Sequence, residues 1–190
     1  MLRAGFVLTG GQSSRMGIDK ALLEFQGATL LRHQAEVVRE AAGSAILIGD
    51  PARYGDLGYR VYPDRIPGCG PAGGIATALS LGVAEWNLIV ACDMPRVTVE
   101  VLRLLIEKTE NASARSVVPI GPDGEPEPLC AVYHTGCLAV LDRALREKRL
   151  KMRDLVREFE PLFVSGISSS CFANVNTPAE WAEIGENSRR

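Results

Sequence analysis

The sequence has little of what marks nucleic-acid-binding, secreted or membrane proteins. Its formal net charge is only −2 over 190 residues, so it offers no general attraction for nucleic acid, and any binding of phosphate must be local. It contains no apolar run long enough to cross a membrane, and its first residues lack the pattern of a signal peptide. We therefore expect a cytoplasmic protein with neither a membrane nor a nucleic-acid partner.

Histidine is scarce and cysteine is scattered. The two histidines, His33 and His134, have no partner that can be recognised from the sequence, so we expect structural roles for them. The cysteines are odd in number and none belongs to a C-x-x-C pair, which argues against a disulfide framework and against a zinc site. We expect reduced and mostly buried thiols at Cys69, Cys92, Cys130, Cys137 and Cys171.

Short apolar runs alternate with segments in which apolar residues recur at helical spacing. The expected strands are residues 6–8, 45–48, 60–62, 87–92, 116–118, 129–133 and 162–164, with one more near Phe172. The expected helices are residues 30–42, 75–83, 99–109, 136–146 and 152–159. Repeated strand–helix–strand order predicts a mostly parallel, Rossmann-like α/β sheet with helices on both faces. No linker or internal repeat interrupts it, so we expect one domain over residues 1–190.

The most informative segment is a glycine-rich, basic loop directly after the first expected strand. It has the sequence LTGGQSSRMGIDK over residues 8–20. Glycines let successive backbone N–H groups turn towards one point, and Arg15 and Lys20 add two cations, a combination that suits a polyphosphate. It is not a Walker loop, because Lys20 does not directly follow a glycine and no Ser or Thr comes after it. A tight turn remains the simpler alternative for the glycines alone.

Carboxylates also follow expected strands. Asp93 comes directly after the strand at 87–92, and Asp50 and Asp64 follow two others. In such sheets ligands bind beyond the carboxyl ends of the strands. A carboxylate among cations is best used to hold Mg²⁺ against a triphosphate, although Asp93 also suits a turn before Pro95.

A second glycine motif favours a different class of protein. Residues 68–73 match G-x-G-x-x-G, and Asp93 lies twenty residues after Gly73, as in dinucleotide-binding oxidoreductases. That fingerprint should follow its strand at once, whereas residues 63–67 intervene here. It also leaves the basic loop without a purpose, so we disfavour this alternative.

Two polar segments lie towards the C-terminus. Asn174 and Asn176 lie two residues apart, so in extended backbone their amides face the same side and can donate and accept hydrogen bonds. They also suit a turn before a helix that starts near Thr177. The basic run at 148–153, which includes Arg149, is typical of a solvated helix face.

Four motifs together resemble those of the molybdenum cofactor guanylyltransferases, a family of nucleotidyltransferases. They are L-x-G-G-x-S-x-R-M-G-x-D-K at 8–20, a G-P-L-A-G-I-like segment at 70–75, C-D-x-P at 92–95 and N-x-N-T-P at 174–178. The resemblance implies transfer of GMP from GTP to the terminal phosphate of molybdopterin, as its molybdenum complex. The products are molybdopterin guanine dinucleotide and pyrophosphate, the implied cofactor is Mg²⁺, and molybdoenzyme maturation proteins are candidate partners.

The resemblance also implies roles for individual residues. It assigns Arg15, Lys20 and Asp93 to catalysis, with Asp93 as the metal ligand. It assigns substrate binding to Leu8, Thr9, Gly10, Gly11, Gly17, Lys20, Asp64, Gly70, Gly74, Asp93, Arg149, Asn174 and Asn176. One position departs from the family, which commonly has an asparagine where this chain has Gly49-Asp50.

Three alternatives stay open. The sister cytidylyltransferases have alanine at the position of Gly10, and we expect that a glycine there lets the backbone approach a purine, favouring GTP over CTP. Sugar-phosphate nucleotidyltransferases share the glycine loop. They usually have a larger substrate domain, and we do not expect the asparagine motif in them. A noncatalytic nucleotide-binding module is disfavoured by the presence of Arg15, Lys20 and Asp93 together.

Overall fold

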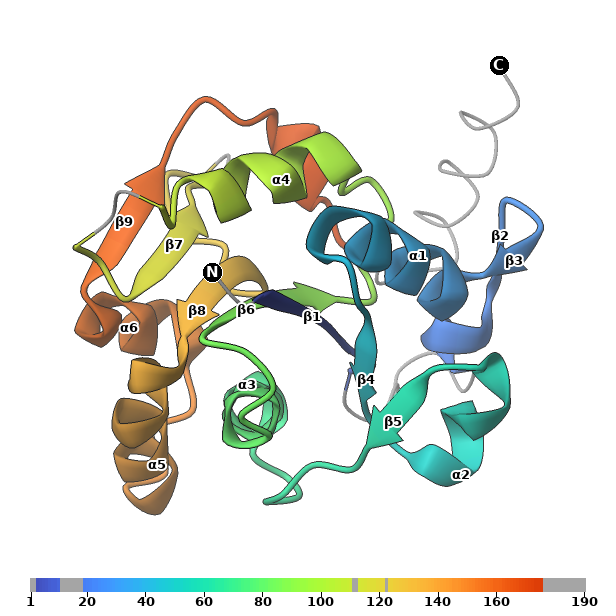
Figure 1. The fold of residues 1–190 in the computed structure, drawn as a ribbon, viewed down its shortest axis with the longest axis horizontal. Coiled ribbons are helices and arrows are strands. Elements are labelled where there is room, and N and C mark those ends of the chain that lie inside the picture. The colour runs from blue at the N-terminus through green and yellow to red at the C-terminus, as the bar shows by residue number, and fades with distance from the viewer. Residues whose placement is uncertain (1–2, 11–18, 111–112, 122, 176–190) are drawn as a thin grey trace.

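A seven-stranded sheet forms the centre of the protein. The structure is a computed structural model that describes residues 3–10, 19–110, 113–121 and 123–175. The strand order is β5-β4-β1-β6-β8-β7-β9 (Figure 1). These strands are β1 Arg3–Leu8, β4 Ile46–Ile48, β5 Arg60–Tyr62, β6 Trp86–Ala91, β7 Ser116–Pro119, β8 Cys130–His134 and β9 Pro161–Val164.

Six of the seven strands run in the same direction. β1 pairs in parallel with β4 and β6, β4 with β5, and β7 with β9, whereas β8 is antiparallel to both β6 and β7. The prediction of a mostly parallel sheet is therefore confirmed. The carboxyl ends of β1, β4, β5 and β6 meet at one edge, which we call the carboxyl edge.

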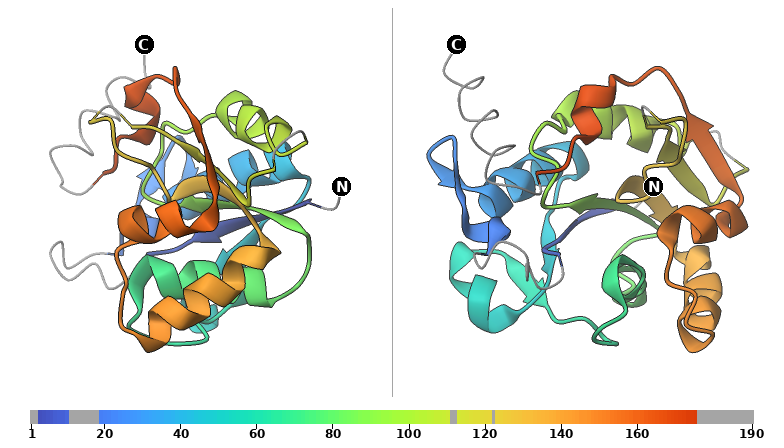
Figure 2. Two further views of the ribbon diagram at one scale, coloured as in Figure 1. Left: turned by 90° about the vertical axis from the view of Figure 1, so that its left-hand side faces the viewer. Right: turned by 180° about the vertical axis from the view of Figure 1, so that it is seen from behind.

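Two layers of helices cover the sheet, as predicted. Helices α1 (Leu30–Ala42) and α4 (Val99–Glu107) lie on one face, and α3 (Gly70–Ser80) and α5 (Leu138–Arg146) on the other (Figures 1 and 2). Each layer has its own apolar core, because strand residues alternate between the two faces. All six residues of β6 are buried, as a central strand of a parallel sheet requires.

Several short elements connect this frame. They are the 3-10 turns η1 Lys20–Leu22, η2 Gly55–Leu57, η3 Thr135–Cys137, η4 Val156–Phe159 and η5 Ser169–Phe172, the hairpin β2 Glu24–Phe25 and β3 Ala28–Thr29, and the helices α2 Pro51–Tyr54 and α6 Met152–Leu155. The expected strand near Phe172 is wrong. Phe172 ends the turn η5, and its buried ring packs into the core beneath α1 and α4.

Helix α3 begins five residues earlier than predicted. The segment from Gly70 to Gly74, expected as a loop, forms its first turn, with Pro71 near the helix N-terminus. Low helix propensity of glycine favoured the loop prediction, but the residues from Ala72 to Leu79 are all buried, and this packing outweighs propensity. Among the helices of the described residues, none is long and apolar enough to span a membrane.

The cysteines and histidines behave as expected. The five cysteines are free thiols, and three of them are buried. The His134 ring accepts a hydrogen bond from the Gly136 N–H at 3.0 Å and packs edge-on against Trp86. The His33 ring packs edge-on against Phe25 and hydrogen-bonds the backbone of Pro95.

Candidate active site

The segments that follow β1, β4 and β6 are joined at the carboxyl edge by backbone hydrogen bonds. The Cys92 N–H donates to the Leu8 carbonyl at 3.0 Å, and the Thr9 N–H donates to the Ile48 carbonyl at 3.0 Å. The Gly49 N–H in turn donates to the Tyr62 carbonyl of β5 at 2.8 Å. The predicted site segments after these strands therefore start from one rigid edge of the sheet.

Thr9 and Gly49 fit together closely. The buried Thr9 hydroxyl also donates to the Ile48 carbonyl, at 3.0 Å. A Cβ atom at Gly49 would lie 2.1 Å from Thr9 Oγ1, a distance that no side chain tolerates. Glycine is thus required at position 49, and the Thr9 side chain has a structural role at this edge.

The backbone conformation at position 10 favours glycine. It is exposed, its φ is +83°, and no heavy atom lies within 4 Å of the position its Cβ would take. Left-handed φ angles favour glycine strongly. The expectation that Gly10 serves a close approach of the nucleotide therefore has a second explanation within the chain itself. Gly11, Arg15 and Gly17 lie outside the described residues.

The carboxyl group of Asp93 interacts electrostatically with the side chain of Lys20. Burial raises the pKa of the Asp93 carboxyl, and the positive charge of Lys20 opposes that rise without cancelling it. Lys20 is the first residue of the turn η1. Asp93 is therefore a largely desolvated carboxylate beside a cation, a pair whose environment favours further positive charge at Asp93.

Asp64, Gly74 and Leu8 meet on the α3 side of the edge. Asp64 Oδ1 is buried and has no hydrogen-bond partner among the described residues, and burial raises the pKa of its carboxyl. A Cβ atom at Gly74 would lie 3.6 Å from Asp64 Oδ1 and 3.2 Å from Leu8 Cδ2. Gly70, at φ +56°, starts α3 and is exposed. An orphaned buried carboxylate oxygen needs an explanation, and a ligand hydroxyl or N–H group would supply one.

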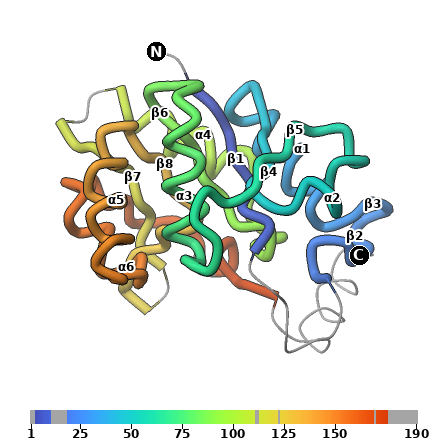
Figure 3. The backbone as a smooth tube through the Cα atoms, turned by 90° about the horizontal axis from the view of Figure 1, so that it is seen from below, coloured from blue at the N-terminus to red at the C-terminus, as the bar shows by residue number. Residues whose placement is uncertain are grey.

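The C-terminal asparagine segment reaches the same place. The Val175 N–H donates to the Asp93 carbonyl at 3.0 Å, and the buried Val175 side chain packs with Phe25 and Leu30. Asn174 next to it is exposed. In Figure 3 this last described segment, drawn in orange-red, runs across the lower part of the view, near the end of β1. Asn176 lies outside the described residues.

Arg149 is engaged by carboxylates. Its guanidinium contacts Glu147 at 2.8 Å and Glu158 at 2.5 Å. A phosphate that bound Arg149 would therefore have to compete with two acidic side chains. The carboxylate of Asp19, the sequence neighbour of Lys20, is bound by Arg53 and Tyr54.

Sequence reasoning missed Asp19, Arg53 and Tyr54. Only the start of α2, which carries Arg53 and Tyr54, had a signal in the sequence, because Asp50 followed by Pro51 is typical of a helix start. The Asp50 carboxylate indeed accepts a hydrogen bond from the Ala52 N–H at 2.9 Å and begins α2. Asp50, at the position where this chain departs from the family that its motifs resemble, thus serves as a helix cap.

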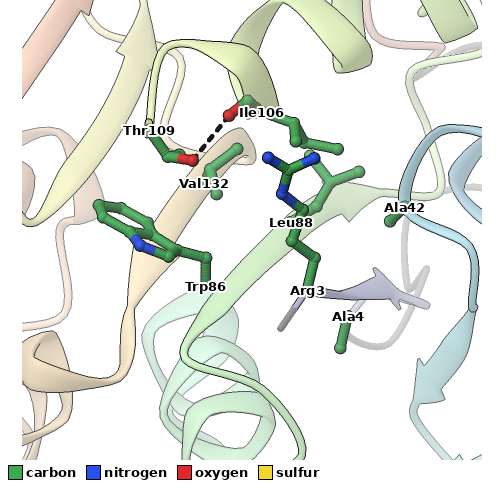
Figure 4. A pocket seen from close by; sticks show the side chains of 8 residues that line it. All are labelled: Arg3, Ala4, Ala42, Trp86, Leu88, Ile106, Thr109 and Val132. Carbon is green, nitrogen blue, oxygen red and sulfur yellow. Dashed lines mark hydrogen bonds between the residues drawn. The ribbon is translucent and has the colours of Figure 1, made fainter. Parts of the chain in front are cut away.

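A small hollow lies away from these residues. Figure 4 shows it at the opposite ends of β1 and β6. Its lining residues are Arg3, Ala4, Ala42, Trp86, Leu88, Ile106, Thr109 and Val132. It has no room for even one water molecule, so it is too small to hold a ligand.

Fold and site define a class of protein. A mostly parallel α/β sheet carries a cation, two desolvated carboxylates and a left-handed glycine turn at its carboxyl edge, which is the arrangement of a nucleotide-binding enzyme. Residues 5–162 match the model of the MobA-like NTP transferase domain, and the chain belongs to this family of nucleotidyltransferases.

Relatives match over the full length. The chain is 38% identical to a probable molybdenum cofactor guanylyltransferase of Pelotomaculum thermopropionicum, over 100% of this chain and 97% of the relative. It is 34% identical to a protein of the same description from Carboxydothermus hydrogenoformans, over 94% and 92%. The crystal structure of molybdopterin-guanine dinucleotide biosynthesis protein A from Archaeoglobus fulgidus superposes with a TM-score of 0.80 at 24% identity, covering 98% of each chain.

Proposed function

We propose that this protein transfers the GMP moiety of GTP to the terminal phosphate of molybdopterin, forming molybdopterin guanine dinucleotide and pyrophosphate. Its full-length similarity to molybdenum cofactor guanylyltransferases supports the substrates. The observation that carries the proposal is the meeting of Lys20, Asp93 and the Asn174–Val175 segment at one edge. It supports the proposal because one of these segments is proposed for the nucleotide and another for the pterin.

The chemistry asks for charge neutralisation and alignment rather than for a nucleophilic side chain. The attacking phosphate oxygen is already anionic near neutral pH, and it must approach the α-phosphate of GTP, which is also anionic. Lys20, with Arg15 of the same loop, would neutralise the triphosphate and the departing pyrophosphate. The exposed N-terminus of α3 at Gly70 presents backbone N–H groups, without a side chain in the way, to the second substrate.

Asp64 and the asparagines would orient the two substrates. The buried Oδ1 of Asp64, which has no hydrogen-bond partner in the part of the chain that the structure describes, is suited to accept a hydrogen bond from GTP. Asn174, held next to Asp93 through the Val175 backbone, would bind the pterin together with Asn176. Arg149 would contribute to the pterin side only when a phosphate displaces its carboxylate partners.

We propose Mg²⁺ as the cofactor, held by Asp93. No group of three or more acidic, histidine or cysteine side chains gathers within the described ranges, so the protein part of the site lacks a closed metal cage there. That fits Mg²⁺, which commonly takes one or two carboxylates and completes its shell with substrate phosphates and water. When bound, the ion would neutralise phosphate oxygens.

We further propose a cytoplasmic enzyme made of a single nucleotidyltransferase domain over residues 1–190, whose product passes to molybdoenzyme maturation proteins. Nucleic acid and membranes are not among its proposed partners. The small net charge supports this part of the proposal.

The test is a competition among nucleotides. Purified protein is incubated with Mg²⁺, equal concentrations of molybdopterin and a sugar phosphate, and equal concentrations of the four nucleoside triphosphates. The product is identified by mass spectrometry. We expect the guanine dinucleotide to dominate. Equal or greater formation of the cytosine dinucleotide would place this chain with the cytidylyltransferases, and a product with a sugar phosphate alone would overturn the pterin assignment.

A further inference from the structure

Helix α2 contacts the turn that carries Lys20. We propose that Tyr54 and Arg53 of α2 are positioning residues for the reaction, which hold Lys20 in place and keep its charge available to phosphate by binding Asp19. The inference rests on the proposed function, because it takes Lys20 to be the cation that meets the triphosphate.

Asp19 is the junction between α2 and Lys20. Its Oδ1 accepts a hydrogen bond from the Ala21 N–H at 3.1 Å and so caps the turn η1, whose first residue is Lys20. Its Oδ2 accepts from the Tyr54 hydroxyl at 2.9 Å and pairs with Arg53 at 2.6 Å. The side chain of Asp19 is only 12% exposed, so these contacts are shielded from water. One carboxylate thus joins two segments more than thirty residues apart.

Helix α2, which supplies Arg53 and Tyr54, is held in place by its neighbours. Helix α2 follows β4 directly, is capped by Asp50, and begins with Pro51. A four-residue helix has little stability of its own, so its position depends on packing. That packing comes from Tyr54, which is 3% exposed and belongs to the core beneath α1 and α4. The packing of Tyr54 in the core therefore fixes the position of its hydroxyl, which in turn holds Asp19.

The contact between Arg53 and Asp19 also matters for the charge around Lys20. Asp19 directly precedes Lys20, and its carboxylate caps the turn that Lys20 begins. Without a second cation, Asp19 would compete with phosphate for its neighbour Lys20. Arg53 supplies that cation, and its guanidinium also lies 5.7 Å from the centre of the Tyr54 ring. Tyr54 stays a hydrogen-bond donor because burial and Asp19 raise the pKa of its hydroxyl.

The structure offers a matched control. Tyr59 donates to the carboxylate of Glu36 on α1, and burial and this bond raise the pKa of Tyr59 to about 12. Tyr59→Phe therefore removes the same kind of bond as Tyr54→Phe, at a place that is not connected to Asp19. Both variants keep the aromatic ring, so both should fold.

The experiment is a double-mutant cycle on GTP binding and turnover. Wild type, Tyr54→Phe, Lys20→Ala and the double variant are compared by calorimetric titration with GTP and by steady-state kinetics with molybdopterin. We expect Tyr54→Phe to lower kcat/KM for GTP by roughly tenfold, through misplacement of Lys20. We expect no further loss when it is added to Lys20→Ala, because the positioned group is gone. Tyr59→Phe should match wild type.

A second pair of variants tests the charge argument. Arg53→Lys keeps a cation next to Asp19 and should retain most of the GTP affinity, whereas Arg53→Gln should weaken it severalfold. Losses from Tyr54→Phe that are equal with and without Lys20, or GTP affinity unchanged in both Tyr54→Phe and Arg53→Gln, would overturn the inference. A wild-type protein that does not bind GTP would instead overturn the proposed function on which it rests.

Discussion

Asp93 illustrates how a single side chain can work against stability. Its carboxyl lies in a desolvated position, and the attraction of Lys20 is too weak to compensate, so the net pKa of Asp93 is raised. Ionised Asp93 is therefore a strained group in the free protein at neutral pH. Such a cost is typical of sites that are completed by a ligand.

We expect Asp93→Asn to separate stability from activity. Replacing the carboxylate by a neutral amide should raise the free energy of unfolding by roughly 1 kcal/mol, or about 2–4 °C in Tm for a chain of this size. Turnover should fall sharply, because an amide holds Mg²⁺ less well. Thermal unfolding and kinetics at limiting Mg²⁺ measure the two effects. The exposed Asp56→Asn is the control, and near-wild-type turnover at limiting Mg²⁺ would refute the metal assignment.

Lys20 should matter for rate more than for folding. If it stabilises charge on the triphosphate as a preorganised donor does, Lys20→Ala should lower kcat on the order of 10²–10³-fold. Circular dichroism checks that the fold is kept. Unchanged kinetics at saturating GTP would show Lys20 to be structural.

Gly10 requires a test that separates backbone strain from base recognition. Because its φ is +83°, Gly10→Ala should destabilise the turn by about 1–2 kcal/mol whichever nucleotide is bound. If Gly10 also serves base recognition, Gly10→Ala should lower kcat/KM for GTP more than kcat/KM for CTP. The measured quantity is the ratio of kcat/KM for GTP to that for CTP, in which common strain cancels. Gly43→Ala, with the same strain at the end of α1, controls for it. An unchanged ratio in Gly10→Ala would leave Gly10 with a backbone role alone.

At the scale of the elements, the contact between the segments after β1 and β4 shapes the edge. We expect Gly49→Ala to destabilise the protein by roughly 1–3 kcal/mol, since a Cβ would meet Thr9 Oγ1 at 2.1 Å. Chemical denaturation measures the loss. Gly55→Ala is the matched control, because its φ is −60° and nothing lies within 4 Å of the added atom. Adding Thr9→Ala should recover part of the loss, and a Gly49→Ala variant as stable as wild type would contradict the packing described here.

Most elements could be predicted because their apolar spacing reflects burial in the sheet. Helix α1 has the predicted bounds, and β5 likewise. The direction of β8 was not predicted, although the sequence between β7 and β8 is short and includes the turn-forming residues Gly-Pro-Asp-Gly, which favours an antiparallel pair. Helix α2 was missed because four residues carry no periodicity.

The candidate site was predictable to the extent that it lies at strand ends. Asp64, Asp93 and Gly10 directly follow or closely follow a strand, so topology alone brings them to one edge. The bond between Tyr54 and Asp19 could not be predicted, because it depends on how α2 packs and not on any repeat in the sequence. For the same reason the carboxylate partners of Arg149 were not foreseen.

At the scale of the whole molecule, buried ionisable groups make stability depend on pH. Burial lowers the pKa of His33 below its usual 6.5, against the opposing effect of its bond to the Pro95 backbone. The unfolded chain therefore binds a proton that the folded protein resists. This contribution to stability is present above pH 6.5 and is lost as the pH falls through the folded pKa of His33.

We therefore expect the free energy of unfolding to fall between pH 7 and pH 5.5, and His33→Gln to show a smaller fall. Urea denaturation of both proteins at several pH values measures the difference. The comparison isolates His33 because the buried carboxyls of Asp64 and Asp93, whose raised pKa values have the opposite effect on stability, are common to both proteins. Parallel pH profiles would contradict a buried, neutral His33.

In the proposed reaction the protein moves GMP intact from GTP to a pterin phosphate. The most direct measurement follows two labels, with GTP carrying ³²P at the α- or at the γ-phosphate in the presence of Mg²⁺ and molybdopterin. We expect α-label to appear in the pterin dinucleotide and γ-label to appear in pyrophosphate in equal amount. Both should appear far more slowly with Lys20→Ala. Release of γ-label as inorganic phosphate, or a pterin product without α-label, would contradict the account.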